Sequence, residues 1–204
     1  MPWPLAAMTA LACLFAPGSV LAESAYITNF ESANVSVIDT ATNNVIATIP
    51  VGLAPFGVAV TSDASRAYVA NAGSGTVSVI HTATDSVLVH IIVGNSSSVP
   101  RGVAVTPDGS KVYVALESGN QVAVIDTVTN TVTTTIPITF PFGVAITPDG
   151  GKAYVTNGSP SVVSEIDTRT NTVSSTVPLG THQALGVAIT PDGSKAYVAS
   201  FASG

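Results

Sequence analysis

The sequence predicts an all-β protein, a β-propeller of four-stranded antiparallel blades with about four blades present. A tyrosine recurs at positions 26, 68, 113, 154 and 197, so the chain consists of repeats of 41 to 45 residues. Each repeat holds four short segments rich in Val, Ile and Thr, separated by turn residues. Hydrophobic residues make up 46% of the chain and charged residues 9%, which excludes disorder and favours sheets that are covered on both faces. Four antiparallel strands in about 40 residues are typical of one propeller blade.

The first strand of each repeat is predicted from a glycine followed by Val, Ala and Val or Ile. It begins 11 residues before the next tyrosine, at positions 57, 102, 143 and 186. In three repeats it ends in Thr-Pro-Asp-Gly, at 106–109, 147–150 and 190–193. Proline and aspartate at the two central positions, followed by glycine, favour a type I turn. The second strand contains the tyrosine, as in residues 68–71.

The third and fourth strands are predicted over segments such as 77–80 and 87–91. Val77, Val79 and Ile80 occupy both odd and even positions, so both faces of this strand are expected to be buried. An Asp-Thr pair 13 residues after the tyrosine, at 39, 126 and 167, predicts an Asx-type turn before the fourth strand. The other fourth strands are expected over 45–49, 132–136 and 173–177.

The repeat resembles that of the YVTN family of β-propeller proteins. The resemblance covers residues 25–204 and is carried by Val-Ile-Asp-Thr, by Thr-Pro-Asp-Gly and by the segments Tyr26-Ile27-Thr28-Asn29, Tyr68-Val69-Ala70-Asn71 and Tyr154-Val155-Thr156-Asn157. It implies a protein that is exported or surface-associated, typically seven-bladed and without assigned chemistry. The sequence departs from the family pattern at residues 61–64, at Leu116 and Ser200, which replace asparagine, and at His81, which replaces aspartate.

The two ends of the chain match incomplete blades. The segment after residue 22 begins with the second strand of one repeat, and the chain ends after the second strand of another. We therefore expect part of a larger ring, a truncated seven-bladed propeller. In the alternative arrangement, residues 184–190 supply the missing first strand of the N-terminal blade and close a four-bladed ring.

Residues 1–22 are predicted to be a secretory signal peptide. Residues 5–16 form an apolar run, and residues 20–22 offer small side chains for cleavage. The run is too short for a transmembrane helix, so no membrane span is expected after cleavage. Cleavage also removes Cys13, the only cysteine, and lipidation of this residue is the weaker alternative. The mature chain, residues 23–204, is therefore expected to be periplasmic, secreted or at the cell surface.

Most charged residues are assigned to turns. An acid and a base lie three residues apart around each turn after the first strand, which predicts weak surface pairing in Asp63/Arg66, Asp108/Lys111, Asp149/Lys152 and Asp192/Lys195. With the three aspartates of the Asp-Thr pairs, they account for 11 of the 18 charged residues. The net charge of −6 and the lack of a basic run in the sequence exclude a phosphate-binding nucleic-acid surface.

No catalytic residues, metal ligands or cofactor-binding residues are predicted. The remaining charged residues come singly from different repeats, so the spacing requires no pair of carboxylates to converge. His81 falls in a turn, His90 on a fourth strand and His182 in a loop. A metal centre needs three or more convergent ligands, which this distribution does not favour.

The candidate binding residues lie in the segments of variable length. Residues 51–56, 93–101, 138–142 and 179–185 are expected on one face of the propeller, and binding residues concentrate on such loops. The residue before each glycine is expected at the mouth of the central channel, with Glu117 and His182 nearby: Phe56, Arg101, Phe142 and Leu185. These side chains either contact a partner or ligand, or only plug the channel.

These observations predict an exported, non-catalytic β-propeller scaffold that presents loops for protein or glycan binding at the cell envelope. Two alternatives stay open. One is a fragment of a propeller enzyme that resembles lactonases or quinoprotein dehydrogenase subunits, with its key residues in other blades or in a partner. The other is a repeat module of a surface-layer or adhesion protein.

Overall fold

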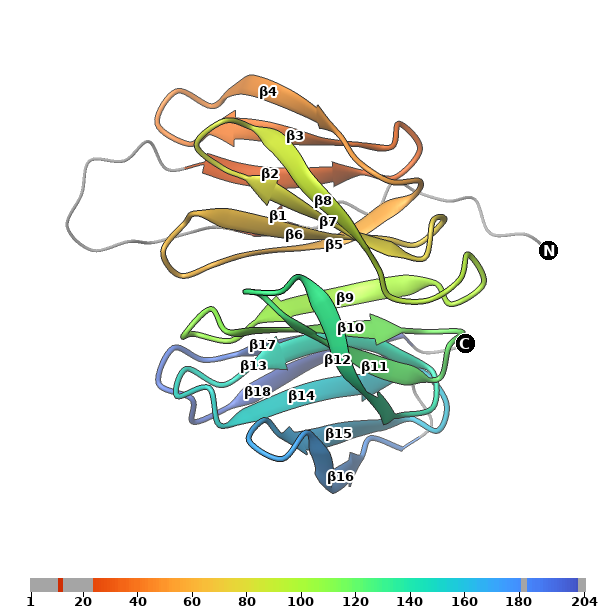
Figure 1. Cartoon of the computed structure of the whole chain (residues 1–204). Coiled ribbons are helices and arrows are strands. Elements are labelled where there is room, and N and C mark those ends of the chain that lie inside the picture. Colours follow the sequence, from red (N-terminus) through yellow and green to blue (C-terminus); the bar gives the residue numbers. More distant parts are fainter. Residues whose placement is uncertain (1–10, 13–23, 181–182, 202–204) are drawn as a thin grey trace.

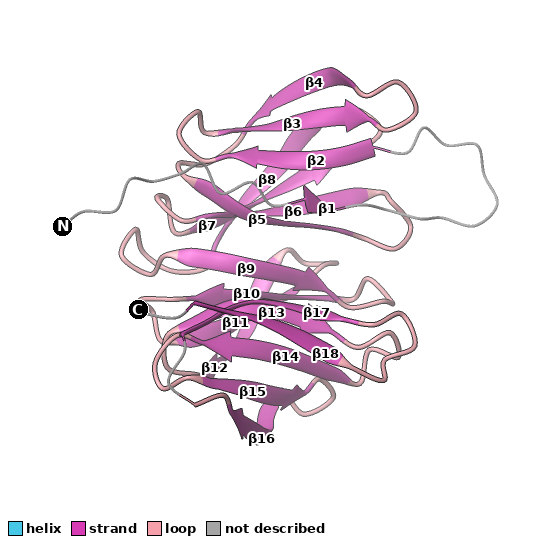
Figure 2. Ribbon diagram, turned by 180° about the vertical axis from the view of Figure 1, so that it is seen from behind, coloured by secondary structure: helices cyan, strands magenta, loops and turns pink. Residues whose placement is uncertain are grey.

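The protein consists of short antiparallel strands joined by tight turns and loops (Figures 1 and 2). The computed structural model describes residues 11–12, 24–180 and 183–201. Within these residues the strands form four four-stranded sheets and one two-stranded sheet. The predicted all-β class with four-stranded antiparallel blades is therefore confirmed.

In blades 2 to 4 the strands follow the predicted order from the innermost to the outermost, and in blade 1 the unpredicted β1 lies at the inner edge. Blade 1 holds β1 (Leu11–Ala12), β2 (Ser24–Asn29), β3 (Asn34–Asp39) and β4 (Asn44–Pro50); blade 2 holds β5 (Pro55–Val60), β6 (Arg66–Asn71), β7 (Thr76–His81) and β8 (Ser86–Ile92). Blade 3 holds β9 (Pro100–Val105), β10 (Lys111–Leu116), β11 (Gln121–Asp126) and β12 (Thr131–Pro137); blade 4 holds β13 (Pro141–Ile146), β14 (Lys152–Asn157), β15 (Val162–Asp167) and β16 (Thr172–Pro178). The hairpin of β17 (Gln183–Ile189) and β18 (Ala196–Phe201) follows.

The blades stack through their inner strands. β5 contacts β9, β9 contacts β13 and β13 contacts β17, so the first strand of each blade lies next to the first strand of the following one. Radial repetition of four-stranded sheets is the architecture of a β-propeller. No sheet contains strands from both ends of the described chain, so no shared sheet closes the described blades into a ring.

The hydrophobic core lies between blades. Between blades 2 and 3, Tyr68 and Val79 pack with Val112 and Ile125, and all four side chains are fully buried. Equivalent clusters lie between blades 1 and 2 and between blades 3 and 4. Burial of each large side chain contributes about 1.5–3 kcal/mol. The third strand of blade 2, β7, buries side chains on both of its faces, as predicted.

The glycine in each first strand allows the inner strands to approach closely. A Cβ atom on Gly102 would lie 2.5 Å from the carbonyl oxygen of Phe142 in the next blade. A Cβ atom on Gly143 would lie equally close to the carbonyl oxygen of Leu185. Only glycine fits at such a close approach of two backbones. The recurrence of glycine in the sequence therefore follows from the close packing of neighbouring inner strands.

A buried asparagine and serine form a polar pair within blade 2. Asn71 Nδ2 donates a hydrogen bond to Ser78 Oγ at 2.9 Å, and both residues are fully buried. The same pair recurs as Asn29 with Ser36, and as Asn157 with Ser164, where Ser164 Oγ donates to Asn157 Oδ1. Blade 3 has Leu116 and Ala123 at these two positions. Blade 3 thus lacks both the asparagine, replaced by Leu116, and the serine, replaced by Ala123. No buried polar group of this pair is left without its hydrogen-bond partner.

The predicted turns are confirmed. The Gly109 amide donates to the Thr106 carbonyl at 2.8 Å, and Gly109 has a φ of 71°. Asp108 accepts hydrogen bonds from Thr106 Oγ1 at 2.5 Å and from the Ser110 amide at 3.0 Å. These hydrogen bonds lower the pKa of the Asp108 carboxyl. Asp126 caps the other turn by accepting from the amides of the second and third residues after it.

The predicted pairing of acid and base around the first of these turns does not form for Asp63/Arg66 and Asp108/Lys111, whose bases bond elsewhere. Arg66 donates from Nη1 to the Thr127 carbonyl of the next blade at 2.8 Å. Lys111 donates from Nζ to the Thr168 carbonyl of the next blade at 2.6 Å. Hydroxyl and amide groups of the turn already donate hydrogen bonds to the aspartate carboxylate. Arg66 and Lys111 therefore bond to the neighbouring blade instead.

Lys152, which was predicted to pair with Asp149, forms an ion pair with Glu165. Lys152 Nζ lies 3.1 Å from Glu165 Oε1, while Tyr154 OH donates to Oε2 and Ser174 Oγ to Oε1, both at 2.9 Å. Burial acts to raise the pKa of Glu165, but the hydrogen bonds outweigh it and lower the pKa. The other blades bury a valine at this position: Val37, Val79 and Val124.

The ends of the described chain do not form the four-bladed ring considered above. β17 pairs with β18 and not with β2, so residues 184–190 do not complete blade 1. β1 occupies that edge instead, with Leu11 opposite Ile27 and Ala12 opposite Tyr26. β1 falls within the predicted signal peptide, and the rest of residues 1–22 lies outside the described residues.

A tyrosine of the second strand reaches the turn of the next blade. Tyr113 OH donates to Asn171 Oδ1 at 2.6 Å, and Asn171 has a φ of 55°. Blade 2 has Asp85 and blade 3 has Asn130 at the position of Asn171, and among the described residues the buried Oδ1 of each has no hydrogen-bond partner. Burial raises the pKa of Asp85. Burial and then the charge of Asp85 raise the pKa of Tyr26 to about 12.

We expect Asp85→Asn to raise the free energy of unfolding by about 1 kcal/mol at neutral pH. The substitution removes a poorly solvated charge and restores the residue present at positions 43, 130 and 171. Because folding raises the pKa of Asp85, the penalty is present above that pKa and is lost below the pKa of the unfolded carboxyl. Urea unfolding of both proteins from about pH 3 to pH 8 measures this. An advantage that does not shrink toward acid pH contradicts the prediction.

Candidate functional site

The loops of variable length lie at one end of the blades. Pro55 at the start of β5 lies opposite Asn71 at the end of β6, and Thr76 at the start of β7 lies opposite Ile92 at the end of β8. Three segments of each blade therefore lie at the same end of its strands: the loop before the first strand, the hairpin between the second and third strands, and the end of the fourth strand. We call this end the loop face and the opposite end, with the Thr-Pro-Asp-Gly turns, the turn face.

Three predicted channel-mouth residues come together on the loop face. The Arg101 guanidinium carbon lies 4.7 Å from the ring centroid of Phe56 and 5.5 Å from that of Phe142. The two rings meet edge to face, with centroids 5.5 Å apart and an interplanar angle of 90°. The three residues are the second residues of β5, β9 and β13, so one repeat position from three successive blades forms this group. We call it the mouth cluster.

Glu117 holds Arg101 from the β10–β11 hairpin. Arg101 Nε donates to Glu117 Oε2 at 2.7 Å, and the two side chains are 23% and 28% exposed. A cation–π contact at such a partly exposed site contributes about 0.5–1 kcal/mol. The ion pair and the two ring contacts therefore fix the guanidinium in one place. The Nη groups of Arg101 donate no hydrogen bond to any of the described residues, since its hydrogen bond comes from Nε. Both Nη groups can therefore donate to a ligand.

The other two predicted residues are placed differently. Leu185 is half-buried on β17, and its carbonyl accepts a hydrogen bond from Thr156 Oγ1 of blade 4. His182 lies outside the described residues. The structure thus brings Phe56, Arg101, Phe142 and Glu117 together, with Leu185 on the next inner strand.

Two exposed hydrophobic residues at the loop tips were missed by the sequence analysis. Leu53 is 63% exposed and Phe140 is 44% exposed. The Gly73 amide donates to the Leu53 carbonyl at 2.9 Å, and the Gly158 amide donates to the Phe140 carbonyl at 2.8 Å. These bonds tie each loop to the hairpin of the following strands. The signal in the sequence was a large apolar residue in a short loop just before a Pro-Phe-Gly segment.

The residue before the proline in three of these loops has a strained backbone. Ala54, Val99 and Phe140 have φ values between 45° and 51°, a region that costs non-glycine residues about 1–3 kcal/mol. The carbonyl of Ala54 accepts from the Ala72 amide at 2.9 Å, and the other two make the equivalent bond. Recurrent strain marks positions that the surrounding structure holds in place, and such positions concentrate at functional sites.

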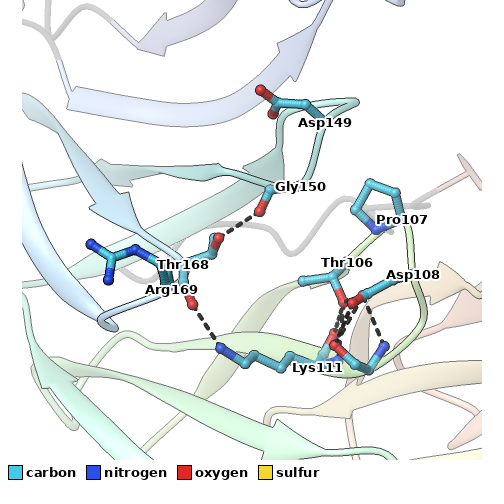
Figure 3. Close-up of a pocket in the computed structure, with 9 residues that line it drawn as sticks. Thr106, Pro107, Asp108, Lys111, Asp149, Gly150, Thr168 and Arg169 are labelled. Carbon is cyan, nitrogen blue, oxygen red and sulfur yellow. Dashed lines mark hydrogen bonds between the residues drawn. The ribbon is translucent and has the colours of Figure 1, made fainter.

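A shallow pocket of about 240 Å³ lies on the turn face, between blades 3 and 4 (Figure 3). Lys111 extends across it to the Thr168 carbonyl, and the Asp108 carboxylate is directed into its own turn. The Arg169 and Asp149 side chains lie apart from each other (Figure 3). The sequence did not predict this pocket, because its walls come from turns of two different blades.

The two described histidines, His81 and His90, make polar contacts within their own blade. His81 Nδ1 lies 3.0 Å from Thr84 Oγ1, and His90 Nδ1 lies 2.9 Å from Ser78 Oγ. Among residues 11–12, 24–180 and 183–201, no three His, Cys, Asp or Glu side chains converge as metal ligands. The same part of the chain contains no helix long and apolar enough to span a membrane.

Solved structures share this architecture. The hydrazine synthase of Kuenenia stuttgartiensis superposes with a TM-score of 0.82 and 28% sequence identity, over 87% of this chain and 52% of that one. A functionally unknown protein from Desulfotomaculum acetoxidans superposes with a TM-score of 0.74 and 19% identity, over 86% of this chain and 59% of that one. This chain therefore spans a little over half the length of each. No protein-family model and no curated protein matches the sequence.

Proposed function

We propose that this chain is an exported, non-catalytic β-propeller scaffold of the YVTN type whose loop face binds a protein or glycan at the cell envelope. The mouth cluster carries the proposal, because Arg101 packs against two phenyl rings and its Nη groups make no hydrogen bond within the described residues. Leu53 and Phe140 add exposed apolar surface to the same face. Arginine and aromatic residues are enriched at binding hot spots, and the remaining guanidinium donors suit carboxylate, carbonyl or hydroxyl oxygens.

The alternative is that the mouth cluster only plugs the channel. Substitutions within the cluster change both the stability of the protein and the surface that could bind a ligand. They therefore do not distinguish binding from filling of the channel. The loop tips separate them better, because Leu53 and Phe140 are exposed and their carbonyls, not their side chains, tie down the loops.

The double variant Leu53→Ser/Phe140→Ser tests binding by the loop face. The purified proteins are applied to a glycan array and to the envelope fraction of the producing cells, with captured proteins identified by mass spectrometry. We expect the double variant to lose binding about tenfold or more, since hot-spot truncations cost above about 1 kcal/mol. Val128→Ser, which changes an 85% exposed residue on the turn face, is the matched control and is expected to bind normally. Equal binding by all three proteins, or no binding by the wild type to either panel, contradicts the proposal.

The likeness to hydrazine synthase supports a second proposal, that the chain is part of a propeller enzyme of the kind that lactonases and quinoprotein dehydrogenase subunits represent. The reacting groups would then lie in residues beyond this chain or in a partner. A third proposal is a repeat module of a surface-layer or adhesion protein within a larger ring. The reading frame of the gene separates these proposals: further blades with convergent His or carboxylate residues favour the enzyme, and appended adhesion domains favour the module.

A further inference from the structure

The outermost strand of blade 2, β8, has an edge unlike those of the other blades. The strands β4, β12 and β16 end in Pro50, Pro137 and Pro178, whereas β8 ends in Ile92. A proline on the edge of a sheet has no N–H group to offer to an incoming strand, and it is one of the features that keep edges from pairing. β8 lacks this protection.

A second protective feature, a β-bulge, covers only the first half of each outer strand. In β8 the bulge lies at Leu88, where the register with β7 shifts between Val79 and Ile80. The same shift occurs in β4, β12 and β16. A bulge disrupts the ladder and bends the strand locally. The segment 89–92 follows the bulge, pairs regularly with β7 and has neither form of protection.

The direction of the free backbone groups follows from the bond at the end of β8. The Val93 amide donates to the Gly75 carbonyl of its own blade at 3.1 Å, so it points inward. Backbone groups alternate in direction along an antiparallel strand. The N–H and C=O groups of Ile92 and His90 therefore point outward, away from β7. In the three sister strands, the proline removes the first of these N–H groups.

Four side chains of β8 are exposed, and two of them, Leu88 and Ile92, are apolar. Ile92 is 76% exposed and Leu88 is 53% exposed, and β8 contains no Asp, Glu, Lys or Arg. The residues equivalent to Leu88 in blades 3 and 4 are Thr133 and Ser174, while blade 1 has the exposed Ile46. An exposed hydrophobic edge without proline or charge is a site for the addition of another strand.

We propose that β8 pairs with β8 of a second copy of this chain, antiparallel and across a two-fold axis. With the axis at Ile91, His90 of each copy lies opposite Ile92 of the other, and the outward groups of these residues exchange about four hydrogen bonds. The two outward positions lie symmetrically about Ile91, which is the self-complementarity that a two-fold contact requires. Because β8 is uncharged, the pairing brings no like charges together along the strand.

Such a contact is small. One strand pair with two or three apolar side chains buries less than the roughly 1,200 Å² of stable interfaces. The dimer is therefore expected to form reversibly, with a dissociation constant of about 10–500 µM. The loop face remains accessible, because the contact lies on the outer edge of blade 2.

Sedimentation equilibrium from about 5 to 500 µM tests the proposal, since it spans this range of dissociation constants. We expect a monomer–dimer equilibrium for the wild type and a loss of at least about tenfold in the association constant for Ile92→Pro. Three sister strands carry proline at this position, so the melting temperature is expected to change little. Ile92→Thr keeps the N–H group and is expected to retain most of the association. Val45→Ser, at a 59% exposed position of β4, is the matched control and is expected to dimerise like the wild type.

Amide hydrogen exchange locates the contact. The amides of His90 and Ile92 are expected to be protected at high but not at low protein concentration, while the Val93 amide is protected at both. A wild type that stays monomeric throughout the range overturns the proposal. An unchanged association constant for Ile92→Pro, or exchange at His90 and Ile92 that is independent of concentration, overturns it as well.

Discussion

Gly102→Ala is expected to lower the free energy of unfolding by about 3 kcal/mol. The added Cβ would lie 2.5 Å from the Phe142 carbonyl oxygen, 2.9 Å from the Val144 amide nitrogen and 3.0 Å from the Gly143 Cα. All three are backbone atoms of the next inner strand and cannot turn aside as a flexible side chain can. β9 and β13 must therefore separate, and the blades repack at a cost. Urea unfolding followed by circular dichroism measures the loss.

Gly186→Ala is the matched control. Gly186 holds the same repeat position on β17, but the nearest atom to an added Cβ is the Ala199 Cβ at 3.9 Å, an ordinary contact. We expect this variant to lie within about 0.5 kcal/mol of the wild type. An equal loss in both variants would show that the glycine serves the conformation of its own strand rather than the approach of two inner strands.

The same glycine position sets the spacing of the candidate site. Arg101 and Phe142 immediately precede Gly102 and Gly143, so the distance between β9 and β13 decides how closely the guanidinium lies to the ring. The geometry of the mouth cluster is therefore a property of inner-strand packing more than of the loops that lead into it.

The repeat spacing explains why so much of the fold was predictable from the sequence. Intervals between tyrosine, glycine and the Asp-Thr pair predicted the strands, both constant turns and the loop face. They also predicted Phe56, Arg101 and Phe142 on one face of the blades, because a single repeat position recurs at the same place in successive blades. In this chain, periodicity carries the information that an alignment of related sequences would otherwise supply.

Contacts between blades were not predictable in this way. Arg66 bonds to Thr127 across 61 residues, and no local pattern identifies that carbonyl as its acceptor. The nearby Asp63 is the obvious partner in the sequence, yet Thr61 Oγ1 and the Ser65 amide already donate to it. Hydrogen bonds from within the turn to the Asp63 carboxylate therefore determine that Arg66 bonds to the next blade instead.

At the strained loop residues, tertiary hydrogen bonds override the local backbone preference of the sequence. A residue before proline normally adopts an extended conformation, and a β-branched residue avoids positive φ. Val99 nevertheless has a φ of 51°, and its carbonyl accepts from the Glu117 amide at 3.1 Å. This bond connects the loop before Arg101 to the hairpin that carries its ion-pair partner, which no local propensity of the sequence indicates.

Leu116→Asn is expected to have the other large effect, a loss of about 3 kcal/mol in the free energy of unfolding. Leu116 is fully buried, and the substitution replaces its apolar contacts with an amide. In blade 2 the equivalent Asn71 donates to Ser78, but blade 3 has Ala123 at the position of that serine. The new amide therefore lacks the hydroxyl that satisfies asparagine in the sister blades. Urea unfolding of the variant and the wild type gives the size of the loss.

Adding Ala123→Ser to Leu116→Asn is expected to recover about 1 kcal/mol, because it rebuilds the hydrogen-bonded pair of the other blades. Ala123→Ser alone is expected to cost about 1 kcal/mol, since it buries a hydroxyl beside Leu116, which offers no partner. The double variant is therefore more stable than the two single losses add up to, and a double-mutant cycle measures this coupling. Additive losses would mean that the asparagine and serine of blades 1, 2 and 4 do not act as a unit. The joint appearance of Leu116 and Ala123 in blade 3 would then need a cause other than the pairing of buried polar groups.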